Sequence, residues 1–315
     1  MRVIFFGSGD FGAPALRWLA NSKHDVVAVV TQPDRPAGRG KQLQATPVAE
    51  RAILESFDLL KLDDVNSDRT IATLREYKAD IGVVIDFGQK LFAEVRSLFP
   101  SQCINVHASL LPKYRGAAPI ARAILNGETK TGVTVFRLVD RMDAGPMLVK
   151  RETMIGPFET AEELHGRLAG VACDALDAAL KLHEQTPLPP GEVQDESQAT
   201  QAPKLSKAEG RIDFTQPAEA IGRYCRGLWP WPGARCRFVG TDGRAVDVTL
   251  SSATATPVET TEPPGTITPI LTVATGRGTL EIHALQPAGK RVMGWQDFVN
   301  GRRVQPGDRF VSLES

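Results

Sequence analysis

Short apolar runs alternate with amphipathic segments along the first 150 residues of this 315-residue chain. Continuous apolar runs bounded by turn residues are typical of strands in a parallel sheet that is covered on both faces. The expected strands are 3–6, 26–30, 81–85, 103–107 and 133–139, and the expected helices are 13–21, 48–57, 67–77 and 117–126. This pattern predicts an α/β fold with a mostly parallel, doubly wound sheet, whose ligands lie outside the carboxyl ends of the strands.

The composition of the chain changes after a long expected helix. Thr160 and Glu163 form a capping box that begins a helix running to about residue 183. Prolines and a polar run between residues 186 and 203 predict an exposed linker. Later strands, broken by Gly and Pro, predict a small β-barrel and are expected at 234–239, 246–251, 265–270, 271–275 and 280–285. We therefore expect an α/β domain at 1–190, a linker at 191–205 and a barrel domain at 206–315.

Charge and cysteine content narrow the classes of function. Lys plus Arg and Asp plus Glu both number 37, so RNA would have to be bound by local patches and not by a bulk basic field. The four cysteines have no C-x-x-C spacing, which indicates scattered thiols in a reducing compartment and no zinc site. The opening apolar run is too short for a signal peptide, and no stretch approaches a membrane span. We expect a cytoplasmic protein without a metal.

Asn105 and His107 are the first candidate site residues. They are two positions apart at the end of an expected strand, so their side chains point to the same face. An amide and an imidazole on one face can stabilise an oxygen that gains negative charge during acyl transfer. Asp140 and Asp143 follow another expected strand, and either can supply a carboxylate near the pair. The residues themselves favour neither aspartate.

Two loops carry weaker signals. Residues 7–12 (GSGDFG) match G-x-G-x-x-G, but the second strand does not end in the acid that would bind a nicotinamide cofactor's ribose. A tight strand-to-helix turn is therefore favoured there. Residues 32–47 hold Arg35, Arg39 and Lys41 with interleaved glycines. This loop is either a solvated surface segment or a basic arm that contacts phosphates.

Segment 105–120 (NVHASLLPKYRGAAPI) closely resembles the signature of the folate-dependent formyltransferases. The loop 32–41 (QPDRPAGRGK), the segment 194–207 (QDESQATQAPKLSK) and the late strand 285–290 (LQPAGK) are similar to parts of that family in the same order. The resemblance implies a Rossmann-like formyltransferase domain followed by an OB-like, tRNA-binding barrel. It also implies 10-formyltetrahydrofolate as formyl donor and initiator Met-tRNA as acceptor, for translation initiation. We expect a monomer.

The resemblance assigns roles to individual residues. By motif match, Asn105, His107 and Asp143 take the catalytic positions, which selects Asp143 over Asp140. The implied tRNA-binding residues are Arg35, Arg39, Lys41 and Lys207. The implied folate-binding residues are Ile85, Phe87, Gly88, Leu91, Ser109, Leu110, Leu111, Pro112, Leu138 and Val139.

Several positions depart from the family pattern. Asp86 and Lys90 make residues 86–91 (DFGQKL) more polar than the usual Ala-Tyr-Gly-x-Ile-Leu, and Pro146 stands where many members carry Asp. None of these departures touches the catalytic positions.

Five other functions compete with this interpretation. A formyltransferase acting on an amino-sugar nucleotide would share the chemistry, but the basic loop and the segment 194–207 argue against it. A formyltetrahydrofolate dehydrogenase would need a further domain, and the related hydrolase is a weaker rival. A non-catalytic RNA-binding protein would give Asn105, His107 and Asp143 no reason to coincide. A nicotinamide oxidoreductase rests on the weak glycine motif alone.

Overall fold

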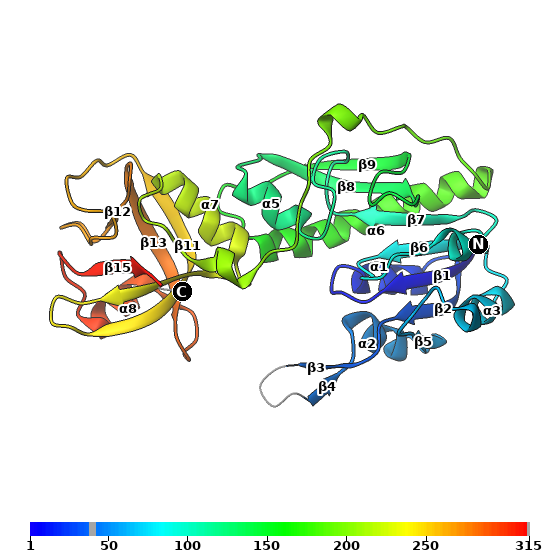
Figure 1. The fold of residues 1–315 in the computed structure, drawn as a ribbon, viewed down its shortest axis with the longest axis horizontal. Coiled ribbons are helices and arrows are strands. Elements are labelled where there is room, and N and C mark those ends of the chain that lie inside the picture. The colour runs from blue at the N-terminus through cyan, green and yellow to red at the C-terminus, as the bar shows by residue number, and fades with distance from the viewer. Residues whose placement is uncertain (38–41, 314–315) are drawn as a thin grey trace. The chain divides into compact units, whose positions relative to one another are not determined.

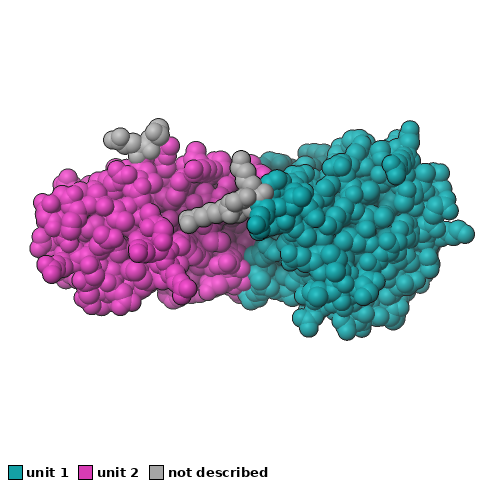
Figure 2. Space-filling view, turned by 90° about the horizontal axis from the view of Figure 1, so that it is seen from below, with its two compact units in different colours: residues 1–116, 131–153, 165–202 teal, residues 117–130, 154–164, 203–315 magenta. Residues whose placement is uncertain are grey.

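The computed structural model describes residues 1–37 and 42–313 (Figure 1). These residues pack into two compact units, coloured teal and magenta in Figure 2. Unit 1 comprises residues 1–116, 131–153 and 165–202, and unit 2 comprises 117–130, 154–164 and 203–315. Each unit is therefore built from several stretches of the chain, whereas the expected domains were contiguous. Among the described residues, no helix is long and apolar enough to cross a membrane.

A seven-stranded sheet forms the centre of unit 1, in the order β5-β2-β1-β6-β7-β8-β9. The first five strands in this order pair in parallel, and β8 pairs antiparallel with β7. The expected mostly parallel α/β sheet is confirmed. Its strands are β1 (Arg2–Gly7), β2 (Asp25–Thr31), β5 (Leu59–Lys61), β6 (Ile81–Ile85), β7 (Cys103–His107), β8 (Lys130–Arg137) and β9 (Met147–Met154). A separate pair is formed by β3 (Arg35–Ala37) and β4 (Gln42–Gln44).

The helices α1 (Ala13–Ala20), α2 (Pro47–Leu54), α3 (Asp68–Glu76) and α4 (Ala93–Arg96) connect these strands, and α6 (Ala161–Gln185) comes later in the chain. Strand alternation divides the buried side chains between the two faces of the sheet. On one face, Phe6 and Cys103 share a core cluster with Leu74 of α3 and Val95 of α4. Because Cys103, Asn105 and His107 alternate along β7, the two candidate site residues point to this same face.

Unit 2 is built around an antiparallel sheet in the order β12-β13-β11-β10-β15. Residue 265 connects its two ends, because the Gly265 N–H donates to the Ala274 carbonyl (2.8 Å) and the Phe310 N–H donates to the Gly265 carbonyl (2.8 Å). The sheet is therefore a nearly closed barrel, as expected. Its strands are β10 (Ala234–Val239), β11 (Ala245–Thr256), β12 (Val273–Ala274), β13 (Thr279–Pro287), β14 (Met293–Gly294) and β15 (Arg309–Ser312), with α5 (Pro119–Leu125), α7 (Ala218–Leu228) and α8 (Trp295–Arg302).

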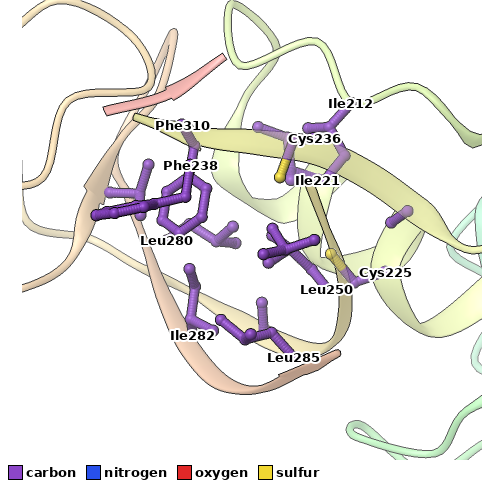
Figure 3. Packing of buried hydrophobic residues seen from close by; sticks show 14 of the residues in the cluster. Ile212, Ile221, Cys225, Cys236, Phe238, Leu250, Leu280, Ile282, Leu285 and Phe310 are labelled. Carbon is purple, nitrogen blue, oxygen red and sulfur yellow. The ribbon is translucent and has the colours of Figure 1, made fainter. Parts of the chain in front are cut away.

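The barrel core is aromatic and aliphatic (Figure 3). The Phe238 ring meets Phe298 of α8 edge-on at 5.3 Å and Phe310 of β15 at 5.7 Å between centroids. The expected strands 265–270 and 271–275 are only partly formed, since just Val273–Ala274 is a strand. Helices α7 and α8 were not predicted. The apolar residues of α7 recur at Ile221, Cys225 and Leu228, which is helical spacing in a region where we expected strands.

Candidate active site

Asn105 lies on β7 between Val84 of β6 and Phe136 of β8. Its side chain is half-buried and makes no hydrogen bond to any residue within 1–37 or 42–313. The apolar residues around it include Val84 and Cys103, which share its face of the sheet. An amide without a protein partner beside an apolar core can bind a substrate oxygen at little cost in protein contacts.

His107 is held in a single orientation. Its side chain is buried, and Nε2 lies 2.8 Å from the carbonyl oxygen of Tyr114. A carbonyl only accepts hydrogen bonds, so we assign the proton of the neutral ring to Nε2. Nδ1 is then the ring nitrogen that remains for chemistry. It lies 3.9 Å from Oδ2 of Asp143, within ion-pair range of a protonated ring but beyond a direct hydrogen bond.

Asp143 lies in the loop between β8 and β9 in a left-handed backbone conformation, with φ of +50°. Its Oδ2 accepts a hydrogen bond from the backbone N–H of Gly116 (2.8 Å). The residue is only 9% exposed. A non-glycine residue with positive φ is strained, so surrounding contacts must hold it there.

Asp140 occupies a different environment. It is exposed, and its carboxylate accepts a hydrogen bond from Arg96 (2.6 Å). The bond to Arg96 and the charge of that guanidinium hold the pKa of Asp140 below its ordinary value. The structure thus brings Asp143, and not Asp140, beside His107. The catalytic roles of Asn105, His107 and Asp143 remain a prediction.

Three residues at this site were missed by sequence reasoning: Arg115, Gln194 and Glu196. Arg115 is 2% exposed and donates to both carboxylate oxygens of Glu196 (2.9 and 3.0 Å) and to Oε1 of Gln194 (2.8 and 3.1 Å). Gln194 is 4% exposed, and Ala202 is fully buried. The expectation of an exposed linker is therefore wrong for these two residues. The Gln194 side chain is buried among hydrogen-bond partners and not on an apolar face, so no apolar periodicity marks it in the sequence.

The expected folate-binding residues fall into different environments. Phe87 and Leu91 are buried in the cluster that contains Val84 and Cys103, and Leu138 packs against it. The Phe87 ring meets Phe6 edge-on at 5.6 Å, so its side chain is part of the core. Ile85 is fully buried, and strand alternation directs it to the face opposite Val84.

Four of the remaining expected folate-binding residues, Ser109 to Pro112, lie in the loop after β7. Ser109 donates to the carbonyl of Lys113 (2.7 Å), so its hydroxyl fixes the loop. Leu111 packs with Phe136 in a small cluster that Leu138 also contacts. Leu110, Pro112 and Val139 are half-buried, and Gly88 is exposed with φ of +78°. Whether any of these residues contacts folate stays a prediction.

Asp86 occupies the space and the backbone donors of the glycine-rich turn 7–12. The N–H groups of Ser8 and Gly9 donate to the carbonyl of Asp86 (2.9 and 3.1 Å). A Cβ added at Gly9 would lie 1.6 Å from Oδ2 of Asp86. A pyrophosphate would need these same amides and this space. The turn therefore argues against a nicotinamide oxidoreductase.

The environment of Asp86 predicts that the stability of the protein depends on pH through this carboxyl group. The residue as a whole is exposed, but burial of its carboxyl raises the pKa, Asp10 adds to the rise, and His165 opposes it. Ionisation of Asp86 therefore costs stability as the pH rises above the ordinary value of about 3.9. We expect Asp86→Asn to raise the melting temperature at pH 7 by about 1–3 °C and to change it less near pH ~3.5.

Thermal melts across this pH range check the prediction. The exposed Asp63 provides a control, because Asp63→Asn removes a carboxylate without the contact to Gly9. A parent protein that is more stable than Asp86→Asn at pH 7 would contradict the expected sign.

The expected tRNA-binding residues are only partly described. Arg35 is exposed on β3, and Lys207 is exposed at the start of a short 3₁₀ helix, Lys207–Gly210. The Lys207 side chain makes no ion pair with another described residue. Arg39 and Lys41 lie outside the described residues. Among the residues that are described, no group of three or more His, Cys, Asp or Glu side chains could hold a metal ion.

Comparison with known proteins matches two long stretches of the chain to formyl transferase families. Residues 1–180 match the model of a family described as formyl transferase, and residues 204–303 match that of the formyl transferase C-terminal domain. The methionyl-tRNA formyltransferase of Solibacter usitatus is 43% identical over 314 residues, which cover 98% of each chain. That of Methylococcus capsulatus is 42% identical over 307 residues, covering 96% of this chain and 98% of the relative.

Solved structures show the same fold at low sequence identity. HypX from Aquifex aeolicus in complex with tetrahydrofolic acid has a TM-score of 0.60 and 18% identity, covering 95% of this chain and 47% of HypX. An N-formyltransferase from Helicobacter canadensis in complex with folinic acid and dTDP-3-aminofucose has a TM-score of 0.61 and 14% identity, covering 89% of this chain and 97% of its own.

Proposed function

Because the chain belongs to the formyltransferase family, we propose that it transfers the formyl group of 10-formyltetrahydrofolate to the α-amino group of initiator methionyl-tRNA. The observation that carries this proposal is the match to methionyl-tRNA formyltransferases over both family domains, at 43% identity and 98% coverage in one relative. The Asn105 amide, which has no hydrogen-bond partner in the described part of the chain, lies on the same strand face as His107 and supplies with Asp143 a site suited to the chemistry. We expect the protein to act as a monomer in the cytoplasm, where translation begins.

The acceptor amine must be neutral to attack the formyl carbon, and such α-amino groups titrate near pH ~8. Attack forms a tetrahedral intermediate whose oxygen becomes an oxyanion. The Asn105 amide and the Nδ1–H of a protonated His107 would donate to that oxygen. Asp143 would stabilise the charge of the imidazolium electrostatically across the 3.9 Å gap.

The tetrahydrofolate nitrogen must gain a proton before it leaves, because a deprotonated amine nitrogen is a poor leaving group. The acceptor nitrogen must lose a proton in the same step. A water bound to the Asp143 carboxylate would provide a route between the two nitrogens. Leu138, which is partly buried against the apolar cluster on the same face of the sheet as Asn105, supports a place for the pterin ring there.

Acceptor RNA would be bound by dispersed basic residues, since the whole chain carries no net formal charge. We propose Arg35, Arg39, Lys41 and Lys207 as phosphate contacts. Lys207→Ala is expected to raise KM for charged tRNA, because each lost phosphate contact weakens binding to RNA of any sequence. A plot of log affinity for tRNA against log salt concentration should be less steep for Lys207→Ala than for the parent, with a slope smaller by roughly 0.7–1.

Kinetics at several salt concentrations check this prediction. Lys181→Ala is the matched control, because Lys181 is an exposed lysine on α6 that pairs with Asp177 (2.6 Å). If Lys207→Ala and Lys181→Ala give the same KM and salt slope, Lys207 does not contact the RNA.

One assay tests the proposed function. The protein is incubated with 10-formyltetrahydrofolate and either methionyl initiator tRNA or an amino-sugar nucleotide, and each acceptor is examined for the mass gain of one formyl group. We expect the gain on methionyl-tRNA alone. Gain on the sugar nucleotide alone would favour that alternative acceptor, and gain on neither would favour a binding protein without catalysis.

A further inference from the structure

We propose that Gln194 is a positioning residue that holds Asp143 beside His107, so that the segment expected to be a linker completes the catalytic centre. The inference rests on the proposed function, because it assigns Gln194 a role through Asp143. It concerns residues 192–202, all of which lie in unit 1 with both partners.

Gln194 hydrogen-bonds to the backbone of the Asp143 loop. Its Nε2 donates to the carbonyl of Asp143 (2.7 Å) and to the carbonyl of Gly145 (2.8 Å). These two bonds fix the loop on both sides of Ala144. They also oppose the strain of the positive φ at Asp143, which would otherwise relax and move the carboxylate.

The opposite end of the Gln194 amide is fixed by a buried cation. Its Oε1 accepts from Nε and Nη2 of Arg115 (3.1 and 2.8 Å). Arg115 in turn makes a two-pronged ion pair with Glu196, two residues farther along the same segment. The planar guanidinium therefore fixes the position of the segment in two directions.

The same segment supports His107 through Tyr114. The Tyr114 carbonyl binds Nε2 of His107, and the Tyr114 N–H donates to Oγ1 of Thr200 (2.8 Å). Arg115 adds two backbone bonds, donating to the Thr200 carbonyl (2.9 Å) and accepting from the Ala202 N–H (2.6 Å). One stretch of chain thus secures the supports of both the imidazole and the carboxylate.

An amide is the group that this position requires. Gln194 accepts from a cation at one end and donates to two carbonyls at the other, and glutamine can do both. Glutamate has nearly the same size and would keep the contacts to Arg115. It would, however, lose both donors and set a carboxylate oxygen against two carbonyl oxygens. Gln194→Glu is therefore a selective way to release the Asp143 loop.

The test compares the parent, Gln194→Glu and Gln198→Glu in formylation of methionyl-tRNA. Gln198 is an exposed glutamine of the same segment whose side chain, among the residues that the structure describes, bonds only to Asp195 (2.9 Å), so its variant is the matched control. We expect Gln194→Glu to lower kcat roughly 10–100-fold, because a misplaced group costs that much. KM for both substrates should stay within about twofold, and Gln198→Glu should match the parent.

A double-mutant cycle then separates positioning from a general structural role. If Gln194 acts through Asp143, Gln194→Glu should cost little more than about twofold in an Asp143→Asn background. An equal fold loss in both backgrounds would overturn the inference, as would parent-like kcat for Gln194→Glu. If Gln194→Glu does not fold, Gln194→Met removes the same two bonds to the Asp143 loop, together with those to Arg115, without adding a charge, and it is judged by the same cycle. A parent that does not formylate methionyl-tRNA would instead refute the proposed function.

Discussion

Asn105→Ala is expected to lower kcat for formyl transfer by about 10²–10³-fold, the usual cost of removing one oxyanion donor. The melting temperature should change by less than about 2 °C. The substitution removes no hydrogen bond, because the Asn105 side chain makes none to any residue that the structure describes. Steady-state kinetics with charged tRNA and a thermal melt of the same preparation measure both effects.

Asn21→Ala is the control for a lost asparagine, because Asn21 is exposed at the end of α1. His107→Ala should also abolish most turnover, but it is less selective. It leaves the buried Tyr114 carbonyl without its donor and so costs stability of about 1–3 kcal/mol. Unchanged kcat for Asn105→Ala, or unfolding of that variant, would refute the oxyanion role.

Asp143→Asn is expected to lower kcat by roughly 10²–10⁴-fold, the range for loss of a group that supports proton transfer. The neutral amide keeps the size of the side chain but removes the negative charge 3.9 Å from Nδ1 of His107. Substrate binding should change little, because Asp143 accepts its hydrogen bond from Gly116 inside the protein. Kinetics that separate kcat from KM check this pattern.

Asp140→Asn provides the matched control, three residues away on the same loop. Asp140 is exposed and pairs with Arg96, so its replacement should leave kcat within about twofold of the parent, as for a surface pair. If Asp140→Asn loses activity and Asp143→Asn does not, the sequence resemblance has selected the wrong aspartate.

The two aspartates show where sequence reasoning reaches its limit. Both follow the same strand, and local pattern alone gives them equal standing. Their surroundings differ because residues far along the chain approach them. Arg96 binds Asp140, whereas Gly116 and Gln194 hold the other aspartate. Such contacts depend on how separate segments pack, which no local periodicity records.

The barrel shows a different kind of limit. Ile221, Cys225 and Leu228 had the spacing of a helix, yet the surrounding short strands led us to expect an all-β domain. At 265–275, β-rich composition predicted two full strands, but the chain forms only Val273–Ala274 as a strand there. Elsewhere in this stretch Ile267 forms a single bridge with Val273, and a single bridge from Thr266 to Arg309 brings the sheet almost to closure. Barrel geometry, and not strand propensity, set those lengths.

The sequence by itself determined the alternating α/β architecture, the later barrel and the shared face of Asn105 and His107, because each follows from spacing along a few consecutive residues. Local spacing left the two aspartates equal, and the family resemblance chose Asp143. Only the tertiary structure showed that Asp143 lies beside His107, which ring nitrogen is free, and that Gln194 is buried. These features arise from hydrogen bonds between residues up to about 80 positions apart, such as Arg115 with Gln194. The polar residues that make such bonds give no periodic signal, so only the folded chain reveals their partners.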